Sequence, residues 1–356
     1  MSNNLFKDLV SSVEQAGVEV NHEALQVAKD KLAMKSIIIR VISILGSLLG
    51  LGLFIGFIAL AASDIFQETI ALIVMGALFL GGAFALNRSN DGAITDSIAV
   101  SLYIIGYAFL SYGLSNDGHM IGYSMFVIAL ITLFLYNNHI ISFLSSLSIL
   151  VAIHVIMFDL EIQTFYYIYL AIVLAATTYL FWQEQRLRTM DNLIGHRYLP
   201  IFAALFTYTL VMGIISSTQQ FGYYYFSEFR VVRLFFITVL VAALLFTVHL
   251  VLDKMKVSKL PIQIATYLLV IIFNVLVAYY YPAFGIACLF ILWGFMRQFK
   301  AGFAVGIATL VWAMGMFYYD LGVSLLAKSI SLMIVGVLFL AIYYLIQKKG
   351  EKHDNI

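Results

Sequence analysis

Long uninterrupted runs of apolar residues are the feature that most constrains how this chain can fold. Twelve such runs follow one another between residues 37 and 346. A helix of about 20 apolar residues crosses roughly 30 Å of hydrocarbon, because each residue adds about 1.5 Å. Only 11% of the 356 residues are charged, against about 25% in an ordinary soluble domain. The pattern predicts an all-α fold, in which about twelve helices form a polytopic transmembrane bundle.

The sequence divides into three regions. Residues 1–36 are predicted to form a short cytoplasmic pair of amphipathic helices, which Gly17 interrupts and Asn21 caps. The transmembrane domain covers 37–346, and 347–356 form a polar cytoplasmic tail. The predicted spans are 37–62, 67–86, 93–113, 119–136, 139–158, 162–182, 198–217, 230–252, 262–280, 282–296, 300–318 and 324–346.

The ninth and tenth spans leave two alternatives open. Pro282 separates the run at 262–280 from the shorter run at 282–296. The two runs are compatible with two crossings, or with a re-entrant hairpin that enters and leaves the membrane on one side. Either arrangement leaves every later loop on the same side of the membrane.

The cations are distributed unevenly between the loops. Seventeen of the 20 Lys and Arg residues fall in the N-terminal region up to Arg40, in the even-numbered loops and their flanks, or in the C-terminal tail. Cytoplasmic loops of membrane proteins have an excess of Lys and Arg. We therefore expect a protein of the inner (cytoplasmic) membrane with both termini in the cytoplasm. The loop at 183–197 is then cytoplasmic, and the loop at 218–229 lies outside.

Tyrosines show the opposite distribution. Thirteen of the 22 tyrosines lie at the predicted non-cytoplasmic interface, including the runs 223–225 and 279–281. Tyrosine prefers membrane interfaces, because its ring is apolar and its hydroxyl binds water. The distribution favours an interfacial belt, and an aromatic-rimmed outward surface for a partner or an amphiphile is the alternative.

The three cations that lie outside the predicted cytoplasmic regions are the most informative polar residues. Arg230, Arg233 and Lys328 are the only cations predicted outside. Arg230 and Arg233 share a helix face, because they are three residues apart at a helix start. We interpret the three cations as ordinary interfacial ion pairs or as a patch that binds an anion, a headgroup or a partner. The candidate outward patch consists of Glu228, Arg230, Arg233, Asp320, Lys328, Tyr318 and Tyr319.

Two polar residues are candidates inside the membrane. His154 lies toward the outer end of its span, and Asn274 lies nearer a midplane. Polar groups in hydrocarbon are costly unless they find partners. For His154 we favour a packing role over a proton relay, and for Asn274 a hydrogen bond between helices over substrate binding.

Glycines at four-residue spacing are expected where helices touch. Small residues of this kind let helix backbones approach closely in lipid. We expect tight packing inside the bundle rather than a dimerisation face. The steps are Gly46 and Gly50, Gly52 and Gly56, and Gly302 and Gly306.

Composition and motifs argue against several classes of chemistry. The net charge of +1 gives no field for nucleic acid. The single cysteine, Cys288, has no partner for a disulfide or a metal cluster. The sequence lacks a phosphate-binding loop, an H-E-x-x-H motif and a G-x-S-x-G motif. We therefore expect no metal site, no cofactor and no nucleic-acid partner, and favour a non-enzymatic protein over an enzyme.

One stretch resembles a known family. Residues 312–340 contain Tyr-Tyr-Asp-Leu at 318–321 and Lys-Ser at 328–329, together with Leu325, Leu326, Leu332, Gly336 and Leu338. This stretch resembles the C-terminal signature of bacterial membrane proteins in domain-of-unknown-function family 4401, which is related to family 2157. The polar lead into a Gly-rich first span is also similar. The resemblance implies a bacterial inner membrane, no assigned activity, and frequent pairing with a membrane-anchored protein named for a G-D-Y-x-x-L-x-Y motif.

Two function classes remain. We favour a multi-pass inner-membrane component of the cell envelope that lies in the lipid bilayer and works with a membrane-anchored partner through its outward face. The alternative is a secondary transporter or lipid-handling permease. The chain has only three prolines, which gives little sign of the broken helices that form many midplane sites. The sequence assigns no substrate and no oligomeric state.

Overall fold

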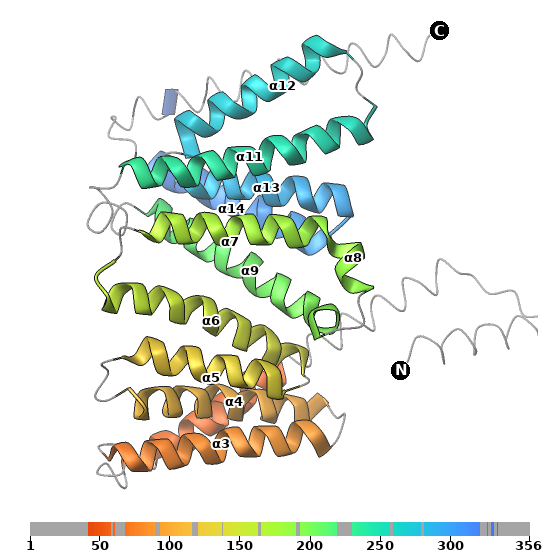
Figure 1. Cartoon of the computed structure of the whole chain (residues 1–356). Helices are drawn as coiled ribbons and strands as arrows, with labels where there is room; N and C mark the ends of the chain where they lie inside the picture. Colours follow the sequence, from red (N-terminus) through yellow and green to blue (C-terminus); the bar gives the residue numbers. More distant parts are fainter. Residues whose placement is uncertain are drawn as a thin grey trace, which may run out of the picture. The chain divides into compact units, whose positions relative to one another are not determined.

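The chain divides into two compact units, one ending at Asp159 and one beginning at Leu160 (Figure 1). Every regular element in the part of the chain described below is a helix, and no strand occurs there. The all-α prediction is therefore confirmed for these residues. The computed structural model describes residues 42–57, 60, 68–89, 93–115, 120–136, 138–162, 165–189, 193–218, 230–256, 259–278, 281–320, 326, 329, 330 and 333.

The first unit begins with an apolar helix at Ile42–Phe57. Oγ of Ser101 approaches the carbonyl oxygen of Ile44 at 3.4 Å, which joins this helix to α4. Consecutive helices pack on one another, as expected when the connections are short. The four further helices are α3 (Thr69–Ser89), α4 (Ala93–Gly113), α5 (Ile121–Leu135) and α6 (His139–Asp159).

Glycines allow α3 and α4 to lie unusually close together. A Cβ atom on Gly76 would lie 2.5 Å from the backbone nitrogen of Leu110, and one on Gly106 would lie 2.8 Å from the backbone nitrogen of Leu80. Real Cβ atoms do not approach backbone this closely. The two helices therefore pack backbone to backbone through small residues, the contact that lipid-embedded helices favour.

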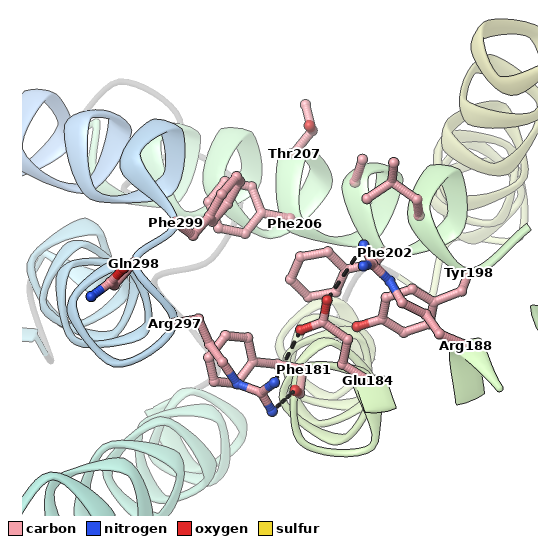
Figure 2. A pocket seen from close by; sticks show the side chains of 12 residues that line it. Phe181, Glu184, Arg188, Tyr198, Phe202, Phe206, Thr207, Arg297, Gln298 and Phe299 are labelled. Carbon is pink, nitrogen blue, oxygen red and sulfur yellow. Dashed lines mark hydrogen bonds and ion pairs between the residues drawn. The ribbon is translucent and has the colours of Figure 1, made fainter. Parts of the chain in front are cut away.

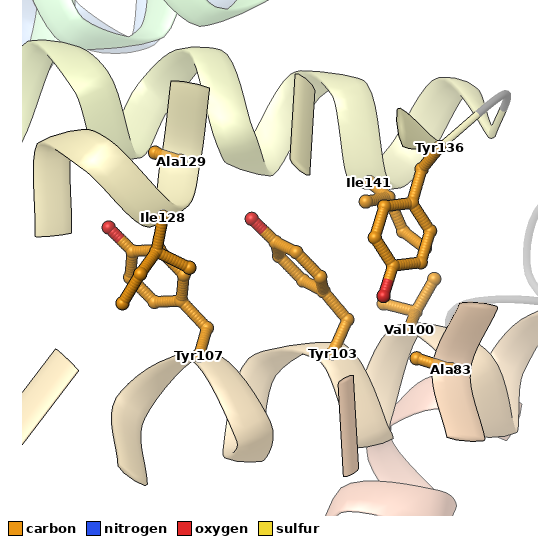
Figure 3. Close-up of a cluster of buried hydrophobic side chains, with 8 residues drawn as sticks. All are labelled: Ala83, Val100, Tyr103, Tyr107, Ile128, Ala129, Tyr136 and Ile141. Atoms are coloured by element: carbon orange, nitrogen blue, oxygen red, sulfur yellow. The ribbon is translucent and has the colours of Figure 1, made fainter. Parts of the chain in front are cut away.

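Three tyrosines form the centre of the first unit's core (Figure 3). Tyr103 lies between Tyr107 and Tyr136, with both ring centroids 5.8 Å away. Each hydroxyl has a hydrogen bond: Tyr103 with Ser145 (2.9 Å), Tyr107 to the Met125 carbonyl (2.9 Å) and Tyr136 to the Leu80 carbonyl (2.6 Å). Their polar atoms are thus satisfied within the unit, so the rings can be buried without an unpaired hydroxyl.

The described elements of the second unit are also helices. Gln298 turns the chain between α13 and α14, with a positive φ of 54°. His249 on α11 and Tyr267 on α12 share a hydrogen bond of 2.9 Å. Its elements are α7 (Tyr166–Trp182), α8 (Glu184–Arg188), α9 (Leu193–Ser217), α11 (Arg230–Lys254), α12 (Leu260–Phe273), the π-helix η3 (Asn274–Ala278), α13 (Pro282–Arg297) and α14 (Lys300–Asp320).

One end of the second unit joins the start of α7, the end of α9 and the start of α13. The hydroxyls of Tyr166 and Ser216 share a hydrogen bond of 2.7 Å. The backbone N–H of Ala283 donates to Oγ of Ser217 at 2.9 Å. We call this the tyrosine end; its members are Tyr166, Tyr167, Ser216, Ser217, Tyr281, Ala283 and Phe317.

The opposite end joins α8 to the ends of α11 and α13. Arg297 lies 3.3 Å from a carboxylate oxygen of Glu184. Nζ of Lys254 donates to the carbonyl oxygen of Met296 at 3.0 Å. We call this the basic end, defined by Arg188, Lys254 and Arg297. Since α13 has one terminus at each end, it runs the full depth of the unit despite its shortness.

Several helices are long and apolar enough to cross a membrane. Among the described residues, five helices meet this description by length and composition, and five shorter helices are also apolar. Large apolar side chains are exposed on these helices, for example Val231 at 79%, Leu53 at 75% and Leu49 at 69%. Contiguous exposure of this kind is costly in water and normal in lipid. The five long helices are Thr69–Arg88, His139–Asp159, Arg197–Ser217, Val231–Lys254 and Lys300–Tyr319.

Eleven of the twelve predicted apolar segments coincide with helices in the described ranges. The predicted segments at 93–113 and 139–158 match α4 and α6 to within one residue. Of the segment at 324–346, the structure describes Leu326, Ser329, Ile330 and Met333, all helical. The N-terminal pair at 1–36 and the tail at 347–356 lie outside the described residues. The number of crossings stays a prediction.

The glycine expectation is met at one helix pair. A Cβ on Gly306 would lie 2.9 Å from the backbone nitrogen of Ile291, so α14 packs closely on α13. No atom of the described residues comes within 4 Å of the Cβ position at the glycines of the Ile42–Phe57 helix, namely Gly46, Gly50, Gly52 and Gly56. Internal packing at these four glycines therefore stays a prediction.

Candidate functional site

Arg233 is the member of the predicted outward patch whose surroundings the structure defines best. It lies in the first turn of α11, at the tyrosine end. Its guanidinium carbon lies 5.6 Å from the ring centroid of Tyr167. Tyr167 is fully buried and packs against the ring of Tyr166 at 71°. A cation over a ring contributes about 0.5–2 kcal/mol, so an aromatic cluster helps to hold this arginine.

The other patch members are only partly described. Tyr319 is 80% exposed near the end of α14, and Tyr318 is half-buried. The last turn of α14 lies at the tyrosine end, because the rings of Phe317 and Tyr281 meet there with centroids 5.5 Å apart. The structure therefore brings Arg233 and the two tyrosines to the same end of the unit. Glu228 and Lys328, and the side chains of Arg230 and Asp320, lie outside the described residues.

The tyrosine end differs from a simple interfacial belt. Tyr166, Tyr167 and Tyr281, which the sequence places at the interface, are only 3%, 0% and 8% exposed. They pack between helices, and the hydroxyl of Tyr166 is bonded to Ser216. Only part of the tyrosine excess at this end is thus available to lipid or to a partner.

His154 has the surroundings of a packing residue. It is half-buried on α6, and its ring lies 5.1 Å from that of Phe158, one turn later. Both rings belong to α6, so this contact lies within one helix. The choice between a packing role and a proton relay for His154 stays a prediction.

Asn274 has a more unusual environment. It is 2% exposed and begins the π-helix η3, where α12 leaves α-helical geometry. Its Nδ2 donates to the Val270 carbonyl at 2.8 Å, which is a bond within its own helix. Its Oδ1 is buried and finds no hydrogen-bond donor among the residues that the structure describes. The expected bond between helices is therefore absent from the described contacts.

A basic pocket, which sequence reasoning missed, lies at the basic end (Figure 2). Its volume is about 480 Å³. The carboxylate of Glu184 bridges two arginines, with one oxygen 3.4 Å from Arg188 and the other 3.3 Å from Arg297. Arg297 also donates to the Phe181 carbonyl at 3.3 Å. We call this the basic pocket, lined by Phe181, Glu184, Arg188, Tyr198, Leu199, Phe202, Ala203, Phe206, Thr207, Arg297, Gln298 and Phe299.

Aromatic rings position the two arginines. The guanidinium of Arg297 lies 5.3 Å above the ring of Phe181, and that ring stacks on Trp293 with centroids 4.5 Å apart. The guanidinium of Arg188 lies 5.6 Å from the centroid of Tyr198. Tyr198 is fixed in turn, because its hydroxyl donates to the Leu180 carbonyl at 2.9 Å. Both cations therefore lie on rigid aromatic supports.

A signal for the pocket was present in the sequence. Tyr198, Phe202 and Phe206 follow one another at four-residue spacing, which places their rings on one face of α9. The same helix begins next to the charged loop at 183–197 that contains Arg188. The partner cation, Arg297, is far away in sequence, and only the packing of α13 beside α7 and α9 brings it to this face.

The comparisons with known proteins identify a family. The family described as Domain of unknown function (DUF4401) matches residues 37–349. A comparison with curated proteins finds no match, and neither does a comparison with solved structures. The match covers most of the chain, including α3 to α14 and the Tyr-Tyr-Asp-Leu and Lys-Ser elements. The chain therefore belongs to the DUF4401 family.

Proposed function

We propose that this protein is a bacterial inner-membrane protein of about twelve spans with both termini in the cytoplasm. Two observations support this orientation. Seventeen of the 20 Lys and Arg residues fall on one predicted side. In the second unit Arg188, Lys254 and Arg297 gather at one end, and the buried tyrosines gather at the other. Cytoplasmic loops are enriched in cations, so the basic end is the cytoplasmic one.

The topology test uses one cysteine at each end of the second unit. Thr218 follows α9 at the tyrosine end, and Thr189 is exposed after α8 at the basic end. In a Cys288→Ala background, an impermeant maleimide added to intact cells should label Thr218→Cys. Thr189→Cys should be labelled only after lysis. The opposite pattern would overturn the orientation.

We propose further that the protein acts as a non-enzymatic component of the cell envelope, working with a membrane-anchored partner through its outward face. The proposal rests on Arg233. This cation lies at the end opposite to the basic end, on an aromatic cluster that holds its charge in place. The exposed ring of Tyr319 lies at the same end. Arginine and tyrosine are the side chains that most often dominate protein interfaces.

The partner test is a pull-down of the full chain in mild detergent. The expected result is a stoichiometric membrane-anchored protein whose sequence contains a G-D-Y-x-x-L-x-Y motif. Capture of proteins without such a motif, in variable amounts, would contradict the proposal. Retention of the partner after washing in neutral detergent separates a direct complex from co-solubilised lipid.

A second candidate function is a secondary transporter or lipid-handling permease. Asn274 favours it, because a buried amide oxygen without a described donor lies where α12 turns into a π-helix. Interrupted helices and their freed polar groups form many transporter sites. Uptake of labelled amino acids, sugars or lysophospholipids into liposomes containing the purified protein would support this function. Uptake equal to that of empty liposomes would exclude it for those substrates.

A further inference from the structure

We propose that the basic pocket binds one anionic phospholipid, with the headgroup phosphate between Arg188 and Arg297 and an acyl chain along the aromatic wall. The inference needs only that the chain lies in a bilayer. It does not depend on the orientation or on the partner proposed above.

Among the described residues that line the pocket, the charges of the polar part sum to one uncompensated positive charge. Two guanidinium groups face a single carboxylate, that of Glu184, which binds one arginine with each oxygen. The side chains of Arg188 and Arg297 are 51% and 31% exposed, so both retain free N–H donors toward the cavity. Arginine binds phosphate oxygens through two parallel N–H bonds. Glu184 therefore positions the two cations without neutralising them, and a phosphate monoanion would balance the remaining charge.

The rest of the pocket is mostly apolar and reaches the lipid-facing surface. Phe202 and Phe206 form the wall on α9 (Figure 2). Leu199 and Phe299 also line the pocket and are 54% and 42% exposed. A small hydrated anion would leave these apolar groups uncovered. An occupant with a charged head and a hydrocarbon chain covers both parts. The burial of each methylene group contributes about 0.8 kcal/mol.

Size and position agree with a lipid. The pocket's 480 Å³ lies within the range of about 300–1,000 Å³ that small-molecule sites occupy. Arg188 ends α8, and Arg297 ends the apolar helix α13. In a bilayer that α13 enters, the end of this helix lies near the headgroup layer. Basic pockets between helices at this depth bind anionic headgroups. A protein segment would need a longer groove than this cavity provides.

The experiment measures lipid binding to the full chain in neutral detergent by native mass spectrometry. The probes are dipalmitoyl phosphatidylglycerol, which is anionic, and dipalmitoyl phosphatidylcholine, which has the same chains and no net charge. Glycerol 3-phosphate is the headgroup anion without chains. We expect the anionic lipid to bind about tenfold more tightly than the zwitterionic one, because both offer a phosphate but only phosphatidylcholine brings a further cation close to the two arginines. Glycerol 3-phosphate should not bind at the same concentrations.

Variants locate the site. Arg188→Gln and Arg297→Gln should each reduce the affinity for phosphatidylglycerol about tenfold. Lys254→Gln is the matched control, because Lys254 lies at the same end outside the pocket, and it should retain wild-type affinity. Phe299→Ala should weaken the binding of the anionic lipid, whereas Phe295→Ala, exposed on α13 outside the pocket, should not. Size-exclusion profiles confirm the fold of each variant; if Arg297→Gln does not fold, Arg188→Gln decides.

Three results would overturn the inference. Equal affinity for the two lipids would show that charge is not recognised. Unchanged binding by Arg188→Gln would place the lipid elsewhere. Binding of glycerol 3-phosphate as tight as that of the intact lipid would indicate a site for a free anion. None of these results depends on the maleimide labelling or on the partner pull-down, so the inference and the proposed function can fail separately.

Discussion

Oδ1 of Asn274 lies directly against Gly285, so that a Cβ atom on Gly285 would come within 2.7 Å of this oxygen. The same Cβ would lie 2.5 Å from Cδ2 of Leu240 on α11. The absence of a side chain at Gly285 thus creates the space that the Asn274 amide occupies between α11, η3 and α13. The buried amide of Asn274 thus lies in a tightly packed interior, where α12 changes to the π-helix η3.

Gly285→Ala should therefore destabilise the second unit. Its new methyl group overlaps two neighbours in a packed interior, and overpacking of this kind costs about 1–3 kcal/mol. The measurement is the thermal unfolding midpoint of the purified protein in detergent. Gly315→Ala on α14 is the control, because its Cβ position has no atom within 4 Å. Equal midpoints for the two variants would contradict the packing described here.

A second prediction distinguishes the contribution of the Tyr103 ring to stability from the contribution of its hydroxyl. Tyr103→Phe keeps the ring contacts but loses the bonds of the hydroxyl to Ser145 (2.9 Å) and Thr132 (3.3 Å), while Ser145 and Thr132 retain their own bond of 3.0 Å. We expect a loss of about 0.6 kcal/mol, typical of a hydrogen bond between membrane helices. Tyr103→Ala also removes the buried ring and should cost about 3–5 kcal/mol. Tyr112→Ala, on the same helix at 52% exposure, should have little effect on unfolding; a comparable loss there would argue against a core centred on Tyr103.

A third prediction concerns Asp320 and Lys328, whose side chains lie outside the described residues. Removing one member of a buried ion pair costs about 3–5 kcal/mol, whereas an exposed pair contributes about 0–1 kcal/mol. If the pair is buried, Lys328→Met should reduce the abundance of folded protein. Adding Asp320→Asn should restore part of it. Abundance of both single variants at the wild-type level would remove the pairing hypothesis.

The helices could be predicted from the sequence because their signal is local. A continuous apolar run specifies a helix wherever lipid is the solvent, and α4 and α6 were located to within one residue. The start of α9 was placed at residue 198, although the helix begins at Leu193. The polar residues before 198 indicated a loop. Packing nevertheless buries Arg197 to 8% exposure. Such burial of a charged residue cannot be predicted from composition.

The site residues could be predicted less well because their contacts are long-range. Arg188 and Arg297 appeared only as cations of two loops on one predicted side of the membrane. Arg188 and Arg297 share the carboxylate of Glu184 as an ion-pair partner, and this arrangement depends on how α13 packs beside α7. Likewise, nothing in the hydropathy of α12 indicates that the helix changes to a π-helix at Asn274. The residues around Asn274 there, Leu240 on α11 and Gly285 on α13, are distant in sequence.

The last prediction tests whether the outward patch, rather than a polar residue within the spans, is responsible for function. Arg230→Gln/Arg233→Gln removes two cations from the tyrosine end. His154→Ala/Asn274→Ala removes the two polar side chains within the helices. If the patch binds the membrane-anchored partner, the arginine variant should capture about tenfold less partner at low salt and still insert and fold.

The difference between wild type and the arginine variant should shrink as salt is added, because exposed charges are screened over about 10 Å at 0.1 M ionic strength. The measurement is the partner pull-down, normalised to folded protein by its size-exclusion profile. The His154 and Asn274 variant should capture the partner as wild type does. If instead that variant abolishes function and the arginine variant preserves it, the permease replaces the envelope component as the proposed function, because the responsible groups then lie inside the helices.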